Sequence, residues 1–363
     1  MAAGSNQLAS LTGLRFFAAM AVVMYHLRLY FNPLGESLTI FEYGFTGVSF
    51  FFILSGFVLT WSHAEEVRPR AFYWNRISRI WPLHVLTMLL AIWAPPLPTS
   101  GGSSWVATPF VLSLTQAWIP ASPFLNAFNG VSWSLSCEAF FYLAFPFLCR
   151  KLATTRASVR AVFTIPAALL VVMVGLAAMS SVSTADYLLG TMPLYRLGEF
   201  VLGISLAKLM KGGWRPPFNA VQATLILGIL SACLFVASLL ANGLVGPIPV
   251  TVANLVMIPG FLIVISACAD GDLSGKKGLL RSSGLIRLGQ WSYALYLIHE
   301  LVIKVVREFA AGVSVGESFV IAALVVLTSV ALSGLLHEVV EKPAERWLRR
   351  RFSAKKPHQV QHA

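Results

Sequence analysis

The chain has 363 residues, of which 57% are hydrophobic and only 12% are charged, with a formal net charge of +12 at pH 7. A mean hydropathy of +0.74 is far above that of a soluble domain, so composition excludes an ordinary water-soluble fold and a disordered chain. The basic residues fall in short blocks between apolar runs, which is the pattern of membrane topology, so we expect no nucleic-acid partner.

Apolar runs of about 20 residues recur along the whole chain, as transmembrane helices require. The runs are continuously apolar rather than alternating, which favours helices over the strands of a β-barrel. We therefore predict an all-α, polytopic transmembrane helical bundle with about ten spans. The predicted spans are 11–30, 44–62, 81–97, 131–149, 161–180, 191–210, 219–241, 249–269, 287–306 and 317–339.

Ten spans place both termini on one side of the membrane, together with alternate loops that are rich in Lys and Arg. By the positive-inside rule this side is the cytoplasm. The basic loops lie at 68–79, 150–160, 208–215 and 276–287.

Two divisions of the chain follow from this topology. Residues 1–341 are predicted to form one integral-membrane domain, and residues 342–363 a short basic cytoplasmic tail.

The apolar stretch 105–119 would move every later loop to the opposite side if it crossed the membrane. It is therefore predicted to be a re-entrant or surface helix on the outer side.

The first predicted span contains two ionisable residues, Arg15 and His26, in the string LTGLRFFAAMAVVMYHL. Eleven helical residues turn through about three full circles, so both side chains share one face about 16 Å apart. An ionisable group at membrane depth is a functional-site hypothesis by default. Because an imidazole gains and loses a proton near neutral pH, His26 is a candidate base.

Further ionisable residues lie inside later predicted spans. Since each costs a few kcal/mol in lipid unless it is paired or hydrated, we expect them to converge with His26 on a common cavity. Arg196 and Glu199 are three residues apart, and a purely structural ion pair is an equally weighted alternative for them. The residues of this group are Glu138, Arg196, Glu199 and His299.

A second basic pair, Arg76 and Arg79, lies in FYWNRISRIWPLH at the cytoplasmic side. Three residues apart on a helix, the two guanidinium groups share one face, and Arg15 is expected near the same surface. Arginine forks suit phosphate groups. The alternative is ordinary positive-inside anchoring.

The four cysteines are scattered among the apolar spans without a C-x-x-C pair. Neither a disulfide framework nor a zinc site is supported, and no metal cofactor is expected.

Seven strings, in order and across nearly the whole chain, resemble those of acyltransferase family 3, a family of membrane proteins. That family transfers acyl groups, commonly acetyl, from cytoplasmic acyl-CoA to hydroxyls of bacterial surface polysaccharides, peptidoglycan, lipid-linked sugars or secondary metabolites. The resemblance implies an enzyme of the bacterial cytoplasmic (inner) membrane that uses acetyl-CoA as donor. The strings are LTGLRFFAAMAVVMYHL, FFILSGFVLTW, FYWNRISRIWPLH, VSWSLSCEAFFYLAFP, YRLGEFVLGISLA, LGQWSYALYLIH and EKPAERWLRR.

The resemblance, together with the chemistry of the side chains, suggests roles for individual residues. His26 would be essential, acting as general base or as a covalent acyl relay. Glu138 would orient its imidazole, as a carboxylate does in hydrolase triads. The three arginines already named would hold the coenzyme A phosphates. Residues expected to line the side of the acceptor, a hydroxyl-bearing glycan or other molecule, are Arg196, Glu199 and His299.

Two other function classes stay open from the residues alone. A proton-coupled transporter or flippase for a glycan or anionic substrate would also use intramembrane His and Glu. An accessory membrane subunit without catalysis would tolerate replacement of His26. The ordered strings favour the enzyme over both.

Overall fold

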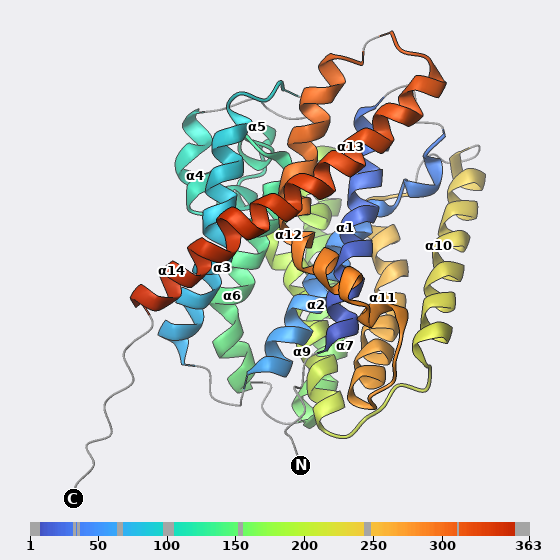
Figure 1. The fold of residues 1–363 in the computed structure, drawn as a ribbon. Helices are drawn as coiled ribbons and strands as arrows, with labels where there is room; N and C mark the ends of the chain where they lie inside the picture. The colour runs from blue at the N-terminus through green and yellow to red at the C-terminus, as the bar shows by residue number, and fades with distance from the viewer. Residues whose placement is uncertain are drawn as a thin grey trace, which may run out of the picture.

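The computed structural model describes residues 8–31, 34, 37–63, 68–96, 105–151, 155–242, 248–310 and 312–352. Within these ranges the chain is helical, without strands, and its long helices form one bundle (Figure 1). The long helices are α1 (Ala9–Tyr30), α2 (Gly47–Ser62), α3 (Pro69–Ala91), α6 (Trp133–Lys151), α7 (Thr155–Ala178), α9 (Pro193–Lys211), α10 (Ala220–Asn242), α11 (Val250–Leu273), α12 (Ser283–Glu308) and α13 (Val315–Leu336). The shorter α-helices are α4 (Thr108–Leu112), α5 (Ser122–Leu125), α8 (Val182–Gly190) and α14 (Lys342–Phe352).

Six helical segments of the described chain are long and apolar enough to cross a membrane. They comprise α1, α2 with the turns before it, α6, α10, α11 and α13 with its continuation. This confirms the predicted all-helical membrane protein. The other long helices, α3, α7, α9 and α12, overlap further predicted spans, and the total of ten spans stays a prediction.

The third predicted span, 81–97, coincides with a helix only in part, because α3 runs from Pro69 to Ala91. The helix begins early because a proline at its first position has the backbone angle that a helix requires. It ends early because two prolines, Pro95 and Pro96, follow shortly after its last turn. Arg76 and Arg79 therefore belong to the same helix as the apolar part of this span.

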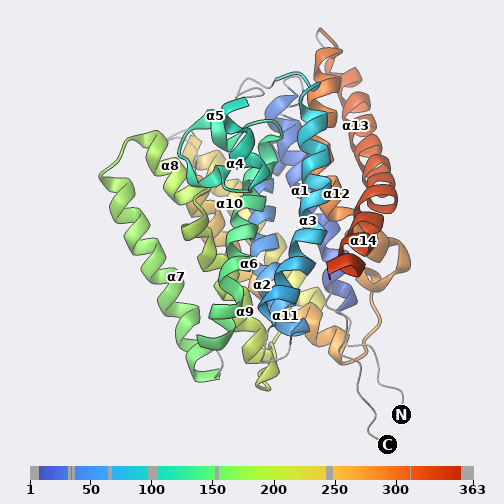
Figure 2. The same cartoon turned by 90° about the vertical axis from the view of Figure 1, so that its left-hand side faces the viewer.

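Residues 105–118 form only short helical pieces, of which α4 has five residues. A helix of that length is about 7.5 Å long, far too short to cross the hydrocarbon layer. In two views at right angles, α4 and α5 lie at the end of the bundle opposite the beginning of α1 (Figures 1 and 2). This agrees with the prediction that the segment does not cross the membrane as one span.

Two close helix crossings depend on glycine. A Cβ on Gly56 of α2 would overlap the Phe200 carbonyl of α9, and a Cβ on Gly203 of α9 would overlap the Ile53 carbonyl of α2. Likewise, a Cβ on Gly289 of α12 would overlap a backbone carbonyl of α1. Small residues let helix backbones approach in this way inside membranes. The second crossing brings α1 and α12 side by side.

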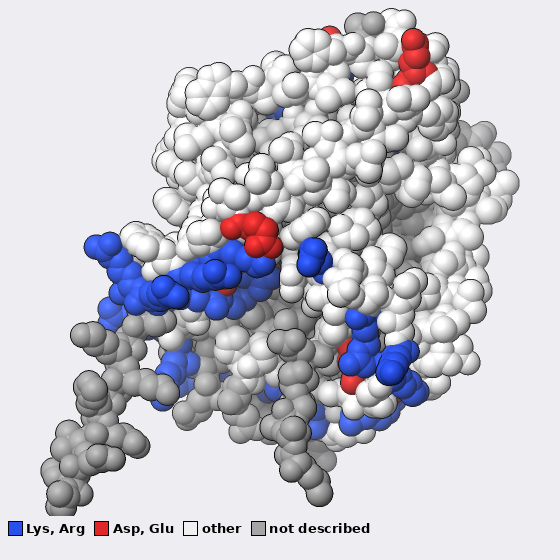
Figure 3. Space-filling model, viewed as in Figure 1, with Lys and Arg blue, Asp and Glu red and all other residues white. Residues whose placement is uncertain are grey.

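Lys and Arg side chains gather over the lower half of the molecule in the view of Figure 3, and the upper half of that face is nearly free of them. Helix α14 contributes to this basic end with Arg349, Arg350 and Arg351 in its last turn. It continues from α13 through a π-helical segment, His337–Glu341, and packs against α3. The described part of the predicted basic tail is thus helical, and residues 353–363 lie outside the described ranges.

Candidate active site

A cavity of about 110 Å³ lies between α1, α2, α3, α6 and α12. Four of the residues singled out from the sequence line it, although they come from three different helices. They are Arg15, Arg76, Arg79 and Glu138. The structure therefore brings the two predicted basic groups together with the predicted acid.

The three arginines of the cavity are half-buried, and within the described chain none of them forms an ion pair. Three guanidinium groups and one carboxylate give the lining a formal charge of +2. The Arg76 guanidinium lies 5.9 Å from the ring centroids of Phe72 and Tyr142, and its Nε is buried without a hydrogen-bond partner. The cavity thus presents positive charge that the neighbouring side chains do not neutralise.

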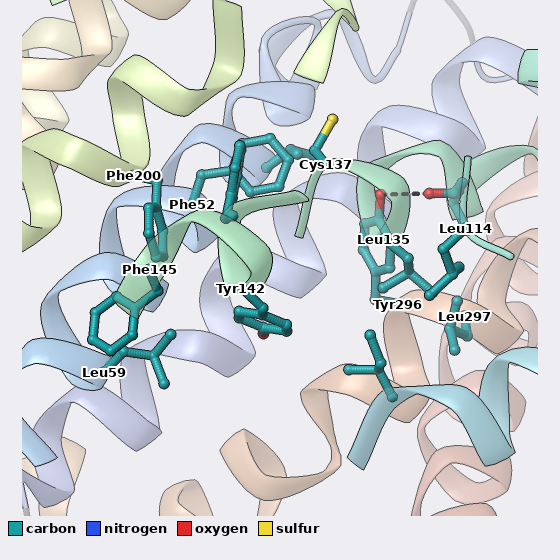
Figure 4. Packing of buried hydrophobic residues seen from close by; sticks show 14 of the residues in the cluster. Phe52, Leu59, Leu114, Leu135, Cys137, Tyr142, Phe145, Phe200, Tyr296 and Leu297 are labelled. Carbon is teal, nitrogen blue, oxygen red and sulfur yellow. Dashed lines mark hydrogen bonds between the residues drawn. The ribbon is translucent and has the colours of Figure 1, made fainter. Parts of the chain in front are cut away.

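The wall formed by α6 is tied to the packed core of the bundle. The Tyr142 hydroxyl donates to Glu138 Oε2 at 3.0 Å, and Tyr142 belongs to a buried cluster with Phe52, Phe145 and Phe200 (Figure 4). The carboxylate is therefore held in place inside the cavity by a hydroxyl, not by a histidine.

Tyr296 of α12 and Phe51 of α2 also line the cavity, with their ring centroids 6.4 Å apart. The Tyr296 hydroxyl donates to the Val131 carbonyl at 3.0 Å, the dashed line in Figure 4, and accepts from Ser134 Oγ at 2.8 Å. The same ring lies 6.0 Å from that of His299. Tyr296 therefore borders the cavity and is also a neighbour of the histidines.

His26 lies outside the residues that line the cavity and contacts His299. Its Nδ1 is 2.9 Å from His299 Nε2, and its ring stacks on Tyr30 with centroids 5.6 Å apart. His299 is completely buried. Sequence reasoning named both histidines but not their pairing, because nothing in two separate helices indicates which side chains will meet.

Arg196 and Glu199 form a buried ion pair at 2.6 Å. Arg196 also donates to the Gly190 carbonyl at 2.6 Å and to Ser49 Oγ at 3.0 Å, and Ser49 Oγ lies 2.9 Å from Asn254 Oδ1. This network ties α2, α9 and α11 together. The arrangement favours the structural alternative for this pair over contact with an acceptor.

A second buried ion pair, Lys304 with Glu300 at 3.0 Å, was missed in the sequence. Lys304 Nζ also donates to the Phe128 carbonyl at 2.9 Å, and the Gly130 N–H donates to Glu300 Oε1 at 3.1 Å. Phe128 has a positive φ of 60°, so these bonds hold a strained turn against α12. The spacing of four residues is the signal that predicts such a pair.

Comparison with known proteins extends these observations. A family model described as "Acyltransferase domain" matches residues 8–338. The acyltransferase MdmB of Streptomyces mycarofaciens is 36% identical over 95% of this chain and 93% of its own length. The O-acetyltransferase OatA of Staphylococcus aureus is 25% identical over 83% of this chain and 51% of its own length.

The peptidoglycan O-acetyltransferase OatA of Listeria monocytogenes is 24% identical over 87% of this chain and 54% of its own length. The chain therefore spans about half the length of the OatA relatives. No solved structure matches. These matches support acyl transfer to a hydroxyl, and hence an enzyme rather than a transporter or an accessory subunit.

Proposed function

The chain belongs to acyltransferase family 3, and on this premise we propose that it transfers an acyl group, acetyl in the first instance, from acyl-CoA to a hydroxyl of a glycan or other acceptor. The observation that carries this proposal is the set of arginines that meet unpaired in one cavity. The donor, the acceptor and the direction of transfer are each part of the proposal.

Unpaired positive charge between helices is costly, and elsewhere among the described residues deeply buried charges are paired. Arg196 pairs with Glu199, and Lys304 with Glu300. The arginines of the cavity instead form no ion pair within the described chain, so an anionic ligand could neutralise them. Phosphate groups of coenzyme A fit this need, because guanidinium forks bind phosphate with charge-assisted hydrogen bonds.

His26 lies about 16 Å along α1 from Arg15. A donor whose phosphates are bound by the arginines has to bridge this distance. A long, narrow pantetheine arm held by its phosphates at the cavity would carry the thioester toward His26. There the acceptor oxygen bonds to the acyl carbon, the carbon–sulfur bond breaks, and the imidazole takes the hydroxyl proton and returns it to the thiolate. In the relay form the imidazole nitrogen bonds to the acyl carbon, the carbon–sulfur bond breaks, and the imidazole proton goes to the thiolate. The acceptor oxygen then bonds to the acyl carbon, the carbon–nitrogen bond breaks, and the hydroxyl proton returns to the imidazole.

We further propose that the basic end of the bundle faces the cytoplasm, where acyl-CoA is made, and that the histidines lie toward the outer side of a bacterial inner membrane. The relatives named as O-acetyltransferases, one of them acting on peptidoglycan, support a glycan acceptor on that outer side.

Binding and turnover of acetyl-CoA by the purified protein in lipid vesicles test the proposal. The double variant Arg76→Ala with Arg79→Ala should bind acetyl-CoA about 10- to 100-fold more weakly, because two charged hydrogen-bonding groups are lost. The matched control is Arg68→Ala with Arg70→Ala, which removes two exposed arginines from the same end of α3 and should bind normally.

Turnover, measured as thiol release, should be lost in His26→Ala. His63→Ala should retain it, because this half-buried histidine caps α2 and packs against Phe72 and Phe145. Equal binding by the two double-arginine variants would contradict the donor site. Full turnover by His26→Ala would contradict the mechanism.

A further inference from the structure

A second imidazole lies against the histidine of the proposed mechanism. His26 Nδ1 and His299 Nε2 are 2.9 Å apart, and the ring planes are inclined at 37° with centroids 5.0 Å apart. The approach is possible because Gly289 lets α12 pack directly against the Thr12 carbonyl of α1. His299 is fully buried at this contact.

The hydrogen-bond partners assign the tautomers of this pair. His299 Nδ1 is 3.1 Å from the Leu295 carbonyl, and a carbonyl only accepts, so Nδ1 carries the hydrogen. In a neutral imidazole the other nitrogen is then an acceptor, and His299 Nε2 accepts from His26 Nδ1. The Val22 backbone, one turn earlier on α1, is a second hydrogen-bond partner of the His26 ring, and a carbonyl there also accepts. A neutral His26 is left with its lone pair on Nε2.

We infer that His299 is a positioning residue that fixes the ring and the tautomer of His26, so that Nε2 is the nitrogen that takes the acceptor's proton or the acyl group. This inference rests on the proposed function. It replaces Glu138, which accepts from Tyr142, as the partner that orients His26. When Nε2 gains a proton, Nδ1 continues to donate to His299, and the positive charge strengthens that bond.

The reverse arrangement, with His299 donating to His26, is disfavoured by the surroundings. It requires either a doubly protonated His299 in a fully buried site or two acceptors facing each other across 3.1 Å. The adjacent carboxylate, Glu300, is already paired with Lys304 Nζ and accepts from the Gly130 N–H through its Oε1.

Nitrogen-15 NMR of imidazole-labelled protein in bilayers tests the geometry without any turnover. The signals of His26 are identified by their loss in His26→Ala. We expect a protonated Nδ1 and an unprotonated Nε2, a preference that His299→Leu weakens, since only the Val22 backbone then remains as a partner of this ring. His299→Gln should keep it, because the Gln side-chain carbonyl can accept from Nδ1. A wild-type His26 protonated on Nε2 would overturn the inference.

Kinetics test the consequence, with thiol release from acetyl-CoA and chitotriose as the hydroxyl-bearing probe. His299→Leu should lower kcat by about tenfold or more while the KM for acetyl-CoA stays unchanged, since one hydrogen bond to the base is lost. His299→Gln should recover most of the loss. The matched control is His84→Leu, which removes a fully buried histidine bonded to the Val111 carbonyl and should leave kcat intact.

Two results separate this inference from the proposed function. If His26→Ala is inactive but His299→Leu turns over like wild type, or if His299→Gln is as defective as His299→Leu, the positioning role is wrong and the proposed function stands. If His26→Ala turns over fully, both fail, and the NMR tautomers then describe a structural pair.

Discussion

Charged residues between these helices are stabilised in two different ways. Arg196 and Lys304 are almost fully buried, and each is neutralised by a carboxylate three or four residues away on its own helix. The arginines of the cavity are more exposed and stay unpaired. The first arrangement holds helices together, whereas the second leaves charge available for a ligand.

Removing one partner of a buried ion pair should therefore cost stability and not donor binding. Glu199→Gln leaves the Arg196 charge without its counter-ion, so we expect a loss of about 3 kcal/mol in the free energy of unfolding, measured by denaturation in detergent micelles. The double variant Arg196→Met with Glu199→Met should recover much of it. Acetyl-CoA affinity should change little in either variant, and a large loss of affinity at unchanged stability would contradict the structural role.

The sequence predicts which ionisable residues lie inside apolar spans. It does not predict which of them contact one another. Charge at membrane depth marked His26, Glu138, Arg196 and His299 individually. The partner of each depends on how helices are rotated against one another. His26 and His299 are contributed by the first and one of the last long helices, and no spacing rule spans that separation.

Among the helices, the crossing of α2 and α9 shows how little space separates their backbones. Gly203 and Gly56 each face a carbonyl of the opposite helix. Such contacts replace the hydrophobic driving force that lipid does not supply.

Gly203→Ala should destabilise the protein by about 1–3 kcal/mol, because the added methyl group overlaps the Ile53 carbonyl unless α2 and α9 move apart. Gly228→Ala in α10 is the matched control, since a Cβ there meets nothing within 4 Å. Thermal unfolding in the same detergent compares them. Equal melting temperatures for the two variants would mean that the crossing is not tight.

The length of the apolar runs predicted which segments form helices. It did not always predict where those helices begin and end. For α3 the apolar window pointed to 81–97, whereas the helix begins at Pro69. The helix packs against α14 and α6, and such tertiary contacts cannot be predicted from composition. The proline pair at 95–96, visible in the sequence, was the better signal for its end.

For the molecule as a whole, the uneven distribution of charge predicts one orientation in the membrane. The segment between α11 and α12 carries Lys276 and Lys277 at the basic end, and Met179 follows α7 at the other end, beside α8 (Figures 1 and 2).

Cysteine labelling of intact cells checks this orientation in a Cys233→Ser background, because Cys233 is the exposed cysteine among the described residues. Met179→Cys, at a position 89% exposed, should react with a membrane-impermeant maleimide from outside. Lys277→Cys should react only after the cells are permeabilised. The opposite pattern would reverse the topology and place the arginine cavity on the outer side.

The hydrogen-bonded Tyr296 has a consequence for the size of group that the protein can transfer. Its hydroxyl is fixed by bonds of 2.8 and 3.0 Å, and its ring both borders the cavity and lies 6.0 Å from the ring of His299. On the proposed function, a thioester that moves from the arginines toward His26 passes this ring. The space beside a ring that is held in place then limits the bulk of the acyl chain, which favours a short group such as acetyl.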